Sequence, residues 1–106
     1  MVGGIYFINM PYSDFKKSKA RPVLVYKMID KSDLLILPLT SNLQRDGINI
    51  TNSDLEDGSL KKESIVIVPK LTAIDSSLII SSKFIATLKQ ESFQRVQVEL
   101  CKRLGC

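Results

Sequence analysis

The chain has 106 residues, 44% of them hydrophobic and 25% charged, which is enough to fill one core and fits a single domain spanning residues 1–106. The formal net charge is +4, from 15 Lys and Arg against 11 Asp and Glu, and it permits a polyanionic partner without requiring one. The sequence contains no histidine, which excludes the commonest general base, the commonest metal ligand and every serine–histidine or cysteine–histidine nucleophile pair.

The apolar stretches and the cysteines indicate the cellular compartment of the protein and the chemical state of its thiols. No stretch approaches the roughly 18 apolar residues that span a bilayer, and the N-terminal segment lacks the pattern of a signal peptide, so we expect a cytoplasmic protein with no membrane partner. The 2 cysteines, Cys101 and Cys106, make no disulfide framework, and a metal site would need histidines or further cysteines. We therefore expect two reduced thiols, no metal and no cofactor.

The first half of the chain predicts strands separated by polar segments. Residues 3–10 (GGIYFINM) alternate in hydrophobicity and suit a strand, whereas residues 11–21 (PYSDFKKSKAR) are polar and suit a loop. Residues 22–29 (PVLVYKMI) form a further strand, which Pro22 can only begin because proline has no N–H for the ladder. Residues 33–41 (DLLILPLTS) are almost continuously apolar, which is typical of a strand that is central or buried on both faces.

The segments that follow are shorter. A turn at Asp46-Gly47 leads into a short alternating strand, and residues 52–63 (NSDLEDGSLKKE) are expected to be loop. Residues 64–74 (SIVIVPKLTAI) predict one strand interrupted by Pro69, followed by a short helical turn that Asp75 caps.

The last segments are a strand and the main helix. Residues 82–88 (SKFIATL) predict the strand, and residues 89–105 the helix. One apolar stripe runs along that helix, and Gly105 suits its C-terminal cap. The members of the stripe are Phe93, Val96, Leu100 and Leu104.

The order of these elements predicts the fold class. Five or six short strands with turn signals between them, and no helices to connect parallel strands, indicate a strongly bent antiparallel sheet or open barrel. One terminal helix packs against it. The class is α+β, and mainly β.

A group of cations stands at the start of the second strand. Lys16, Lys17, Lys19 and Arg21 lead directly into Pro22, and such crowding of like charges is relieved by an anion or a partner. The lysines suit the sequence-independent phosphate contacts of nucleic-acid binding, although a solvated loop has the same composition.

Aromatic residues lie in the same segment. Tyr12 and Phe15 are interleaved with the cations, which is what a single-stranded RNA binder needs, because bases stack on aromatic rings with roughly 1–3 kcal/mol each. The alternative is that Phe15 anchors the loop beneath itself.

Several segments in order resemble the MazF/PemK family of toxin endoribonucleases. They are GGIYFINM, SKARPVLVYK, LLILPLTSN, GSLKKESIVIV, LTAID and ATLKQESFQRV, and together they cover nearly the whole chain. The resemblance implies a small SH3-like barrel that forms a homodimer and cleaves single-stranded RNA at short sequence motifs without a metal. It also implies 2′-hydroxyl attack on the adjacent phosphate, and inhibition by a cognate antitoxin protein.

Two candidate catalytic residues carry over from this resemblance. Arg21 matches the family arginine assigned to acid and phosphate-stabilising work, and Thr40 matches the threonine beside the scissile phosphate. The residues themselves support this, since a guanidinium meets two phosphate oxygens and Pro22 stiffens the backbone that aims it.

Structural alternatives remain for each of these residues. Arg21 could pair with Asp14 or Asp33, and the hydroxyl of Thr40 could satisfy a backbone group. Ser41 could donate to RNA or form a turn.

The sequence also departs from the family pattern. The histidine that some relatives use in the first loop is absent, and Pro69 stands about where an Arg-x-Asp motif would place its aspartate. The acceptor of the 2′-hydroxyl proton stays open between Asp14, a lysine and water. Two alternatives to a nuclease are a non-catalytic toxin that poisons gyrase and a remnant that only binds an antitoxin.

Overall fold

The computed structural model describes the backbone of residues 1–11 and 18–106, and the side chains of residues 1–9 and 20–106. The predicted calls that fall on residues 12–17 lie outside this range. The described strands are β1 (Gly4–Pro11), β2 (Ser18–Met28), β3 (Asp33–Thr40), β4 (Ile48–Ile50), β5 (Leu55–Gly58), β6 (Ser64–Val66), β7 (Thr72–Asp75) and β8 (Lys83–Leu88). The helices are α1 (Ser77–Ile80) and α2 (Gln90–Leu104), and 3-10 turns occupy Asn52–Asp54 and Val68–Lys70.

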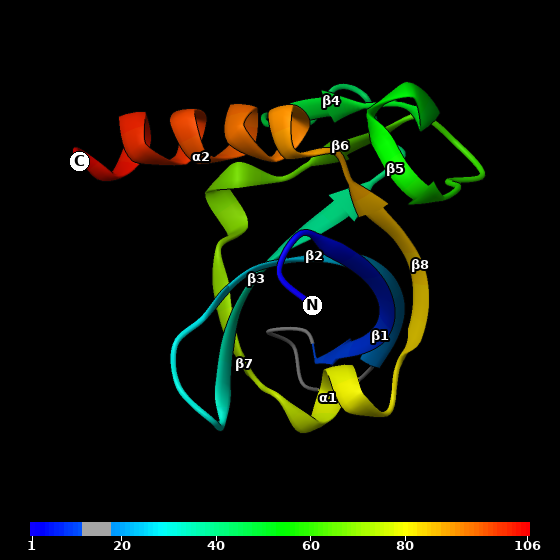
Figure 1. Ribbon diagram of the computed structural model, residues 1–106, viewed down its shortest axis with the longest axis vertical. Coiled ribbons are helices and arrows are strands. Elements are labelled where there is room, and N and C mark those ends of the chain that lie inside the picture. The colour runs from blue at the N-terminus through cyan, green and yellow to red at the C-terminus, as the bar shows by residue number, and fades with distance from the viewer. Residues whose placement is uncertain (12–17) are drawn as a thin grey trace.

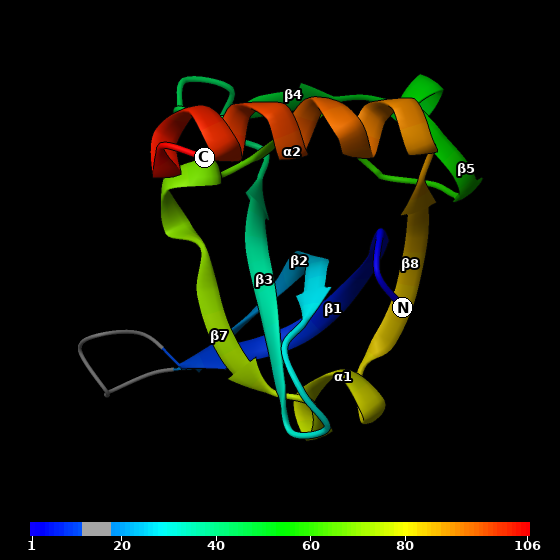
Figure 2. The same cartoon turned by 60° about the vertical axis from the view of Figure 1, so that its left-hand side comes forward.

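The strands form one sheet in the order β4-β6-β3-β2-β1-β8-β5, with β7 paired to β3 off this path. Every pairing is antiparallel. The sheet curls into a half-barrel, with α2 lying across one end and α1 at the opposite end (Figure 1 and Figure 2). The predicted class, mainly β with a C-terminal helix, is confirmed, and the described sheet has 8 strands rather than five or six.

The central strands are buried on both faces. Leu37 and Leu39 of β3 belong to the core cluster that contains Val96 of α2, whereas Leu34 and Ile36 belong to a second cluster on the other face. This burial confirms the interpretation of the apolar run, because a strand with a core on each side has no solvent face for polar residues.

Pro22 and Pro38 each lie in a strand at a position where the sheet lacks a paired neighbour on one side. β2 begins at Ser18, so the prediction that Pro22 begins the strand is wrong, and Pro22 lies opposite Phe7 of β1. The β2–β3 ladder starts only at Val23, which leaves an unpaired edge at Pro22 that tolerates a missing N–H. Pro38 falls between the β3–β7 pairing, which ends at Ile36, and the β3–β6 pairing, which begins at Leu39.

Two predictions for the middle of the chain are wrong. The segment expected to be loop contains β5, which pairs with β8 from Leu55 opposite Leu88 to Gly58 opposite Ala86. Short polar strands of this kind form because a partner is available, not because their own residues favour β structure. The segment 64–74 divides into β6 and β7, because Pro69 lies in a 3-10 turn that separates them.

The residues predicted to cap the two helices lie at or next to the observed helix ends. Asp75 accepts a hydrogen bond from the N–H of Ser77 at 2.8 Å, although the structural N-cap of α1 is Ser76. Gly105 ends α2 with φ of +80°, as predicted. The predicted stripe is buried only as far as Leu100, since Leu104 is 65% exposed. Within the described residues, neither helix is long and apolar enough to cross a membrane.

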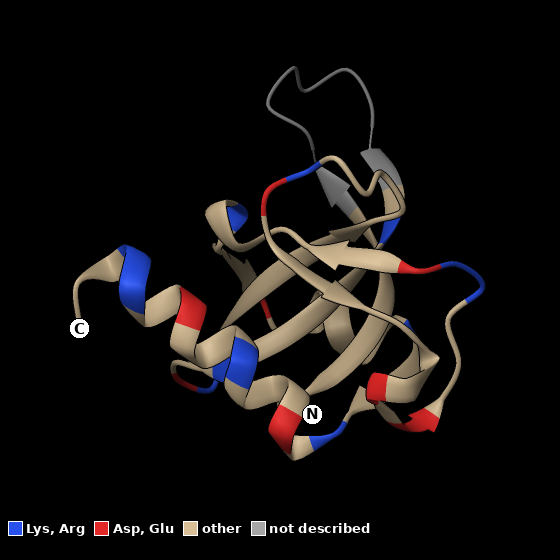
Figure 3. Ribbon diagram, turned by 90° about the horizontal axis from the view of Figure 1, so that it is seen from above, with Lys and Arg blue, Asp and Glu red and all other residues tan. Residues whose placement is uncertain are grey.

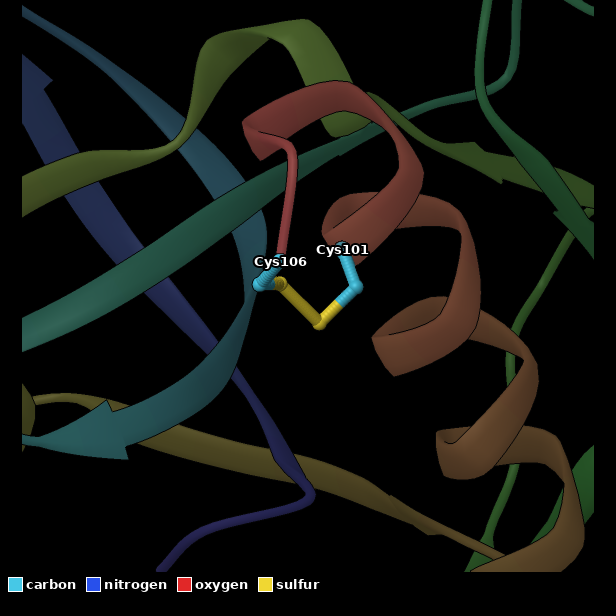
Figure 4. The surroundings of a disulfide bond; sticks show 2 residues. All are labelled: Cys101 and Cys106. Atoms are coloured by element: carbon cyan, nitrogen blue, oxygen red, sulfur yellow. A yellow bond between two sulfur atoms is a disulfide. The ribbon is translucent and has the colours of Figure 1, made fainter.

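The expectation of two reduced thiols is wrong, because Cys101 and Cys106 form a disulfide (Figure 4). The left-handed Gly105 turns the chain back on the last helical turn, where the N–H groups of Gly105 and Cys106 both donate to the carbonyl oxygen of Cys101. This turn brings the two Cα atoms to 5.0 Å, within the range that a disulfide spans. A sequence separation of five residues across a helix end does not reveal that proximity.

Candidate functional site

A groove of about 560 Å³ opens on the sheet where β1, β2, β3 and β8 meet the segment between β5 and β6. We call it the groove throughout. Its lining is apolar at the floor and carries lysines and hydroxyl groups besides. The lining residues are Phe7, Pro22, Leu39, Thr40, Ser41, Ser59, Leu60, Lys61, Lys62, Ser64, Lys83, Phe84 and Ile85.

The floor of the groove continues the face that forms the first core cluster. Ile5 of β1 is fully buried in that cluster, and Phe7, two residues further on the same face, is 42% exposed. Phe7 lies opposite Pro22 of β2 in the β1–β2 ladder. The sheet therefore changes along one face from a closed core to an open apolar surface.

Lysines supply the charge of the groove. Lys83 of β8 lies opposite Phe7 in the β1–β8 ladder, and Lys61 and Lys62 come from the segment that leads into β6. The neighbouring carboxylate of Glu63 accepts a hydrogen bond from the side-chain amide of Asn49 at 2.6 Å. None of the described lining residues is acidic, so the groove attracts anions.

The segment that carries Lys61 and Lys62 is held in place directly before the two lysines. Gly58 has φ of +78°, and a Cβ atom there would collide with the carbonyl oxygen of Ile85, so only glycine fits this turn. Leu60 is buried, and its N–H donates to Oδ1 of Asn52 at 2.8 Å. Lys61 and Lys62 therefore rise from an anchored backbone.

Thr40 and Ser41 stand at one side of the groove. Thr40 is the last residue of β3, and its Oγ1 accepts a hydrogen bond from the N–H of Asn42 at 3.1 Å. This contact is the structural role foreseen for the threonine, and it leaves the hydroxyl proton able to donate to a ligand. Ser41 is exposed and lines the groove as well.

Arg21 lies beside the groove rather than among its lining residues. It belongs to β2, pairs with Ile8 of β1 and is half-buried. The β2–β3 ladder ends at Val23 opposite Pro38, and continuing that register by two residues leads to Arg21 and Thr40. Both residues thus lie at the same end of adjacent strands. Asp33, one of the carboxylates considered as a partner of Arg21, is the first residue of β3. It lies about 23 Å from Thr40 along the extended strand.

The remaining predicted RNA-binding residues fall in the segment before β2. Tyr12, Phe15, Lys16 and Lys17 lie outside the described residues, and only the backbone of Lys19 is described, opposite Met10. The sequence reasoning did not identify the groove residues Phe7, Lys61, Lys62 and Lys83. The adjacent lysines of SLKKES were a usable signal, whereas nothing local marked the other two.

The carboxylate of Asp54 is engaged on the α2 side of the molecule. Asp54 accepts hydrogen bonds from the N–H of Thr51 at 2.9 Å, from Ser92 at 2.8 Å and from Arg95 at 2.8 Å. Burial raises the pKa of Asp54, but these hydrogen bonds and the charge of Arg95 outweigh it and leave the pKa below its ordinary value. Asp54 is therefore a charged anchor between the 3-10 turn and α2.

A second ion pair ties the end of α2 to the turn after β3. Both guanidinium NH2 groups of Arg103 donate to Asp46 at 2.6 Å, and Arg103 also pairs with Glu99 at 3.1 Å. The hydrogen bonds from Arg103 lower the pKa of the Asp46 carboxyl. No group of 3 or more potential metal-ligating side chains occurs within the described part of the chain.

The half-barrel with a C-terminal helix is the fold of known toxin structures. Among solved structures, the chain is similar to MazF in the MazE-MazF crystal structure (form II) from Deinococcus radiodurans, with a TM-score of 0.72 and 17% identity over 98% of this chain and 94% of that chain. MazF (form I) from Deinococcus radiodurans gives 0.71 with 16% identity over 99% and 96%. The Mycobacterium tuberculosis toxin MazF-mt6 gives 0.69 with 16% identity over 96% of both chains. At this identity the likeness establishes the fold.

Comparison with protein families establishes more. The family described as PemK-like, MazF-like toxin of type II toxin-antitoxin system matches residues 1–104. The chain belongs to this family, which confirms the resemblance found in the sequence. No curated protein matches the chain.

Proposed function

We propose that this toxin is a metal-independent endoribonuclease that cleaves single-stranded RNA at a short sequence motif. The 2′-hydroxyl oxygen attacks the adjacent phosphorus, the bond to the 5′-oxygen breaks, and a 2′,3′-cyclic phosphate and a free 5′-hydroxyl result. The attacking hydroxyl gives its proton to a base or to water, and the leaving oxygen takes one up. The observation that carries the proposal is the groove, which joins three lysines to a strand-end threonine with no carboxylate among its described lining residues.

Arg21 and Thr40 are the groups we assign to the chemistry. Charge builds up on the phosphoryl oxygens in the transition state, and a positioned guanidinium can stabilise it by about 3–4 kcal/mol. The location of both residues at the same end of adjacent strands supports a shared phosphate between them. Thr40 supplies a hydroxyl donor whose oxygen is already oriented by the N–H of Asn42.

Lys61, Lys62 and Lys83 are proposed to contact the RNA backbone on the groove side of the scissile phosphate. Tyr12, Phe15, Lys16, Lys17, Lys19 and Ser41 remain proposed contacts to the same strand. Lysines bind phosphates as point charges without reading sequence, so these contacts set affinity and register rather than motif choice.

The proposed partners besides RNA are a cognate antitoxin and a second copy of the chain. The similar structure from Deinococcus radiodurans holds MazE together with MazF, which supports an antitoxin partner. An acidic antitoxin segment would compete with RNA for the lysines of the groove.

Incubation of the purified protein with a mixed-sequence single-stranded RNA in excess EDTA tests the proposal. We expect fragments with cyclic phosphate and 5′-hydroxyl ends, and mapping of those ends gives the motif. RNA that stays intact, or cleavage that EDTA abolishes, contradicts the proposal. Intact RNA together with blocked DNA supercoiling would instead select the gyrase-poisoning alternative.

A further inference from the structure

Phe7 is a large apolar residue that the fold leaves open inside the groove. It is 42% exposed, although Ile5 on the same face of β1 is fully buried. Phe84, the other exposed aromatic residue of the groove, contacts the ring of Tyr6 edge-on, with a centroid distance of 5.6 Å. Among the described aromatic residues, Phe7 has no such ring partner. Part of its ring is therefore open to a ligand.

The surroundings of Phe7 favour a ligand that is both flat and anionic. Pro22 lies directly opposite in the β1–β2 ladder and Lys83 directly opposite in the β1–β8 ladder, so the ring stands between an apolar neighbour and a cation. Lys61 and Lys62 line the same groove, and its described lining contains no carboxylate. A volume of about 560 Å³ lies within the usual range of small-ligand sites.

An unpaired nucleotide combines these properties, since its base stacks on an aromatic ring while its phosphate meets a cation. A base in a duplex has both faces covered and cannot do so. We propose that Phe7 is the stacking residue for one unpaired base of the RNA substrate, with Lys83 beside it on the adjoining phosphate. This inference rests on the proposed function, and it adds a binding residue on the rigid sheet to the aromatics of the segment before β2.

The test uses the absence of tryptophan from the chain. A Phe7→Trp variant carries one indole at the groove, and its fluorescence reports stacking directly. The probe is a mixed-sequence single-stranded RNA of twelve 2′-O-methyl nucleotides, about the length of a short binding site, which the proposed reaction cannot cleave. We expect the RNA to quench the indole, and the same sequence in a duplex to leave it unchanged.

Affinity measurements with the same probe separate stacking from apolar contact. We expect Phe7→Ala and Phe7→Leu each to weaken binding by roughly 5- to 150-fold, and Phe7→Trp to bind within about threefold of wild type, because only tryptophan keeps a π-face. Val98→Ala, an exposed apolar residue of α2 outside the groove, is the control and should leave affinity unchanged. Thermal unfolding of each variant confirms that it is folded.

Three results would overturn the inference. Phe7→Leu could bind like wild type, the indole could stay unquenched at saturating RNA, or its fluorescence without RNA could change with protein concentration, which would show a second copy covering the ring. If the wild type binds no RNA at all, the proposed function fails together with this inference. If the wild type binds and cleaves RNA while position 7 is silent, only the inference fails.

Discussion

The groove and the α2 side of the molecule differ in whether their charged side chains form ion pairs. On the α2 side, the arginines of the helix meet carboxylates of other segments, Arg95 with Asp54 and Arg103 with Asp46. Acidic and basic residues alternate along the helix (Figure 3). In the groove, Lys61, Lys62 and Lys83 form no ion pair with any of the described residues.

This difference distinguishes arginines that form ion pairs within the fold from groove lysines that form none with the described residues. Arginine forms fixed, hydrogen-bonded pairs that tie a helix to loops. A solvated lysine without a carboxylate partner changes the stability of the fold little, and its charge can still bind an anion. The groove also contains exposed aromatic rings. The aromatic residue of α2, Phe93, is instead stacked on Tyr26, with a distance of 5.6 Å between the ring centroids. The contrast predicts that changes in the groove alter RNA handling, and that changes beside α2 alter stability.

The largest effect is expected at Arg21. Arg21→Ala should lower the rate of RNA cleavage by roughly 10²- to 10³-fold, since it removes the group that stabilises charge in the transition state. Initial rates on a cleaved RNA measure this. Lys102→Ala removes the same charge from α2 and should leave the rate near wild type. Equal rates for both variants would break the contrast between the two regions.

A smaller effect is expected when the lysines of the groove are removed together. The triple variant Lys61→Ala, Lys62→Ala and Lys83→Ala should weaken binding of uncleavable RNA by roughly 10- to 100-fold and make the dependence on salt concentration shallower by about 2 in log–log slope.

The matched control removes three exposed lysines that do not line the groove. These are Lys31, Lys70 and Lys102, and their replacement by alanine lowers the net charge by the same amount. Fluorescence polarisation at several salt concentrations measures both. Equal losses would mean that net charge alone, and not the groove, binds RNA.

The smallest effect is a change in stability on the α2 side. Asp54→Ala should lower the free energy of unfolding by about 2 kcal/mol at pH 7, because it removes the carboxylate that completes the capping box with Thr51 and that anchors Ser92 and Arg95. The pKa of Asp54 is lowered in the folded state, so its stabilising effect is complete well above 3.8 and is lost as the pH falls through the folded value.

Urea unfolding from pH 7 to pH 3 follows that dependence. The difference between the wild type and Asp54→Ala should shrink below pH 4, and RNA binding at pH 7 should not change. Asp57→Ala is the control, since Asp57 is exposed on β5. A difference that stays constant down to pH 3 would show that the carboxylate charge contributes nothing to the anchor.

Local patterns in the sequence were enough to predict most of the elements. The apolar run of β3 and the capped, amphipathic α2 have periodicities that one segment carries by itself. The order of the motifs was enough to identify the family, which the match over residues 1–104 confirms. β5 was missed because its residues, LEDG, become a strand only when β8 lies beside them. The disulfide was missed because the left-handed Gly105 decides whether the two cysteines meet.

The sequence alone therefore determined most of the strands, the C-terminal helix and the family, and the resemblance to that family supplied the two candidate catalytic residues. Which residues come together in the groove was decided only by the tertiary structure. Phe7 and Lys83 are 76 positions apart and come together because β1 pairs with β8 in one register. A slip of one residue in that register would turn each side chain to the other face. Because such long-range pairing depends on the packing of the whole sheet, no local pattern could show which lysines and which aromatic ring share one groove.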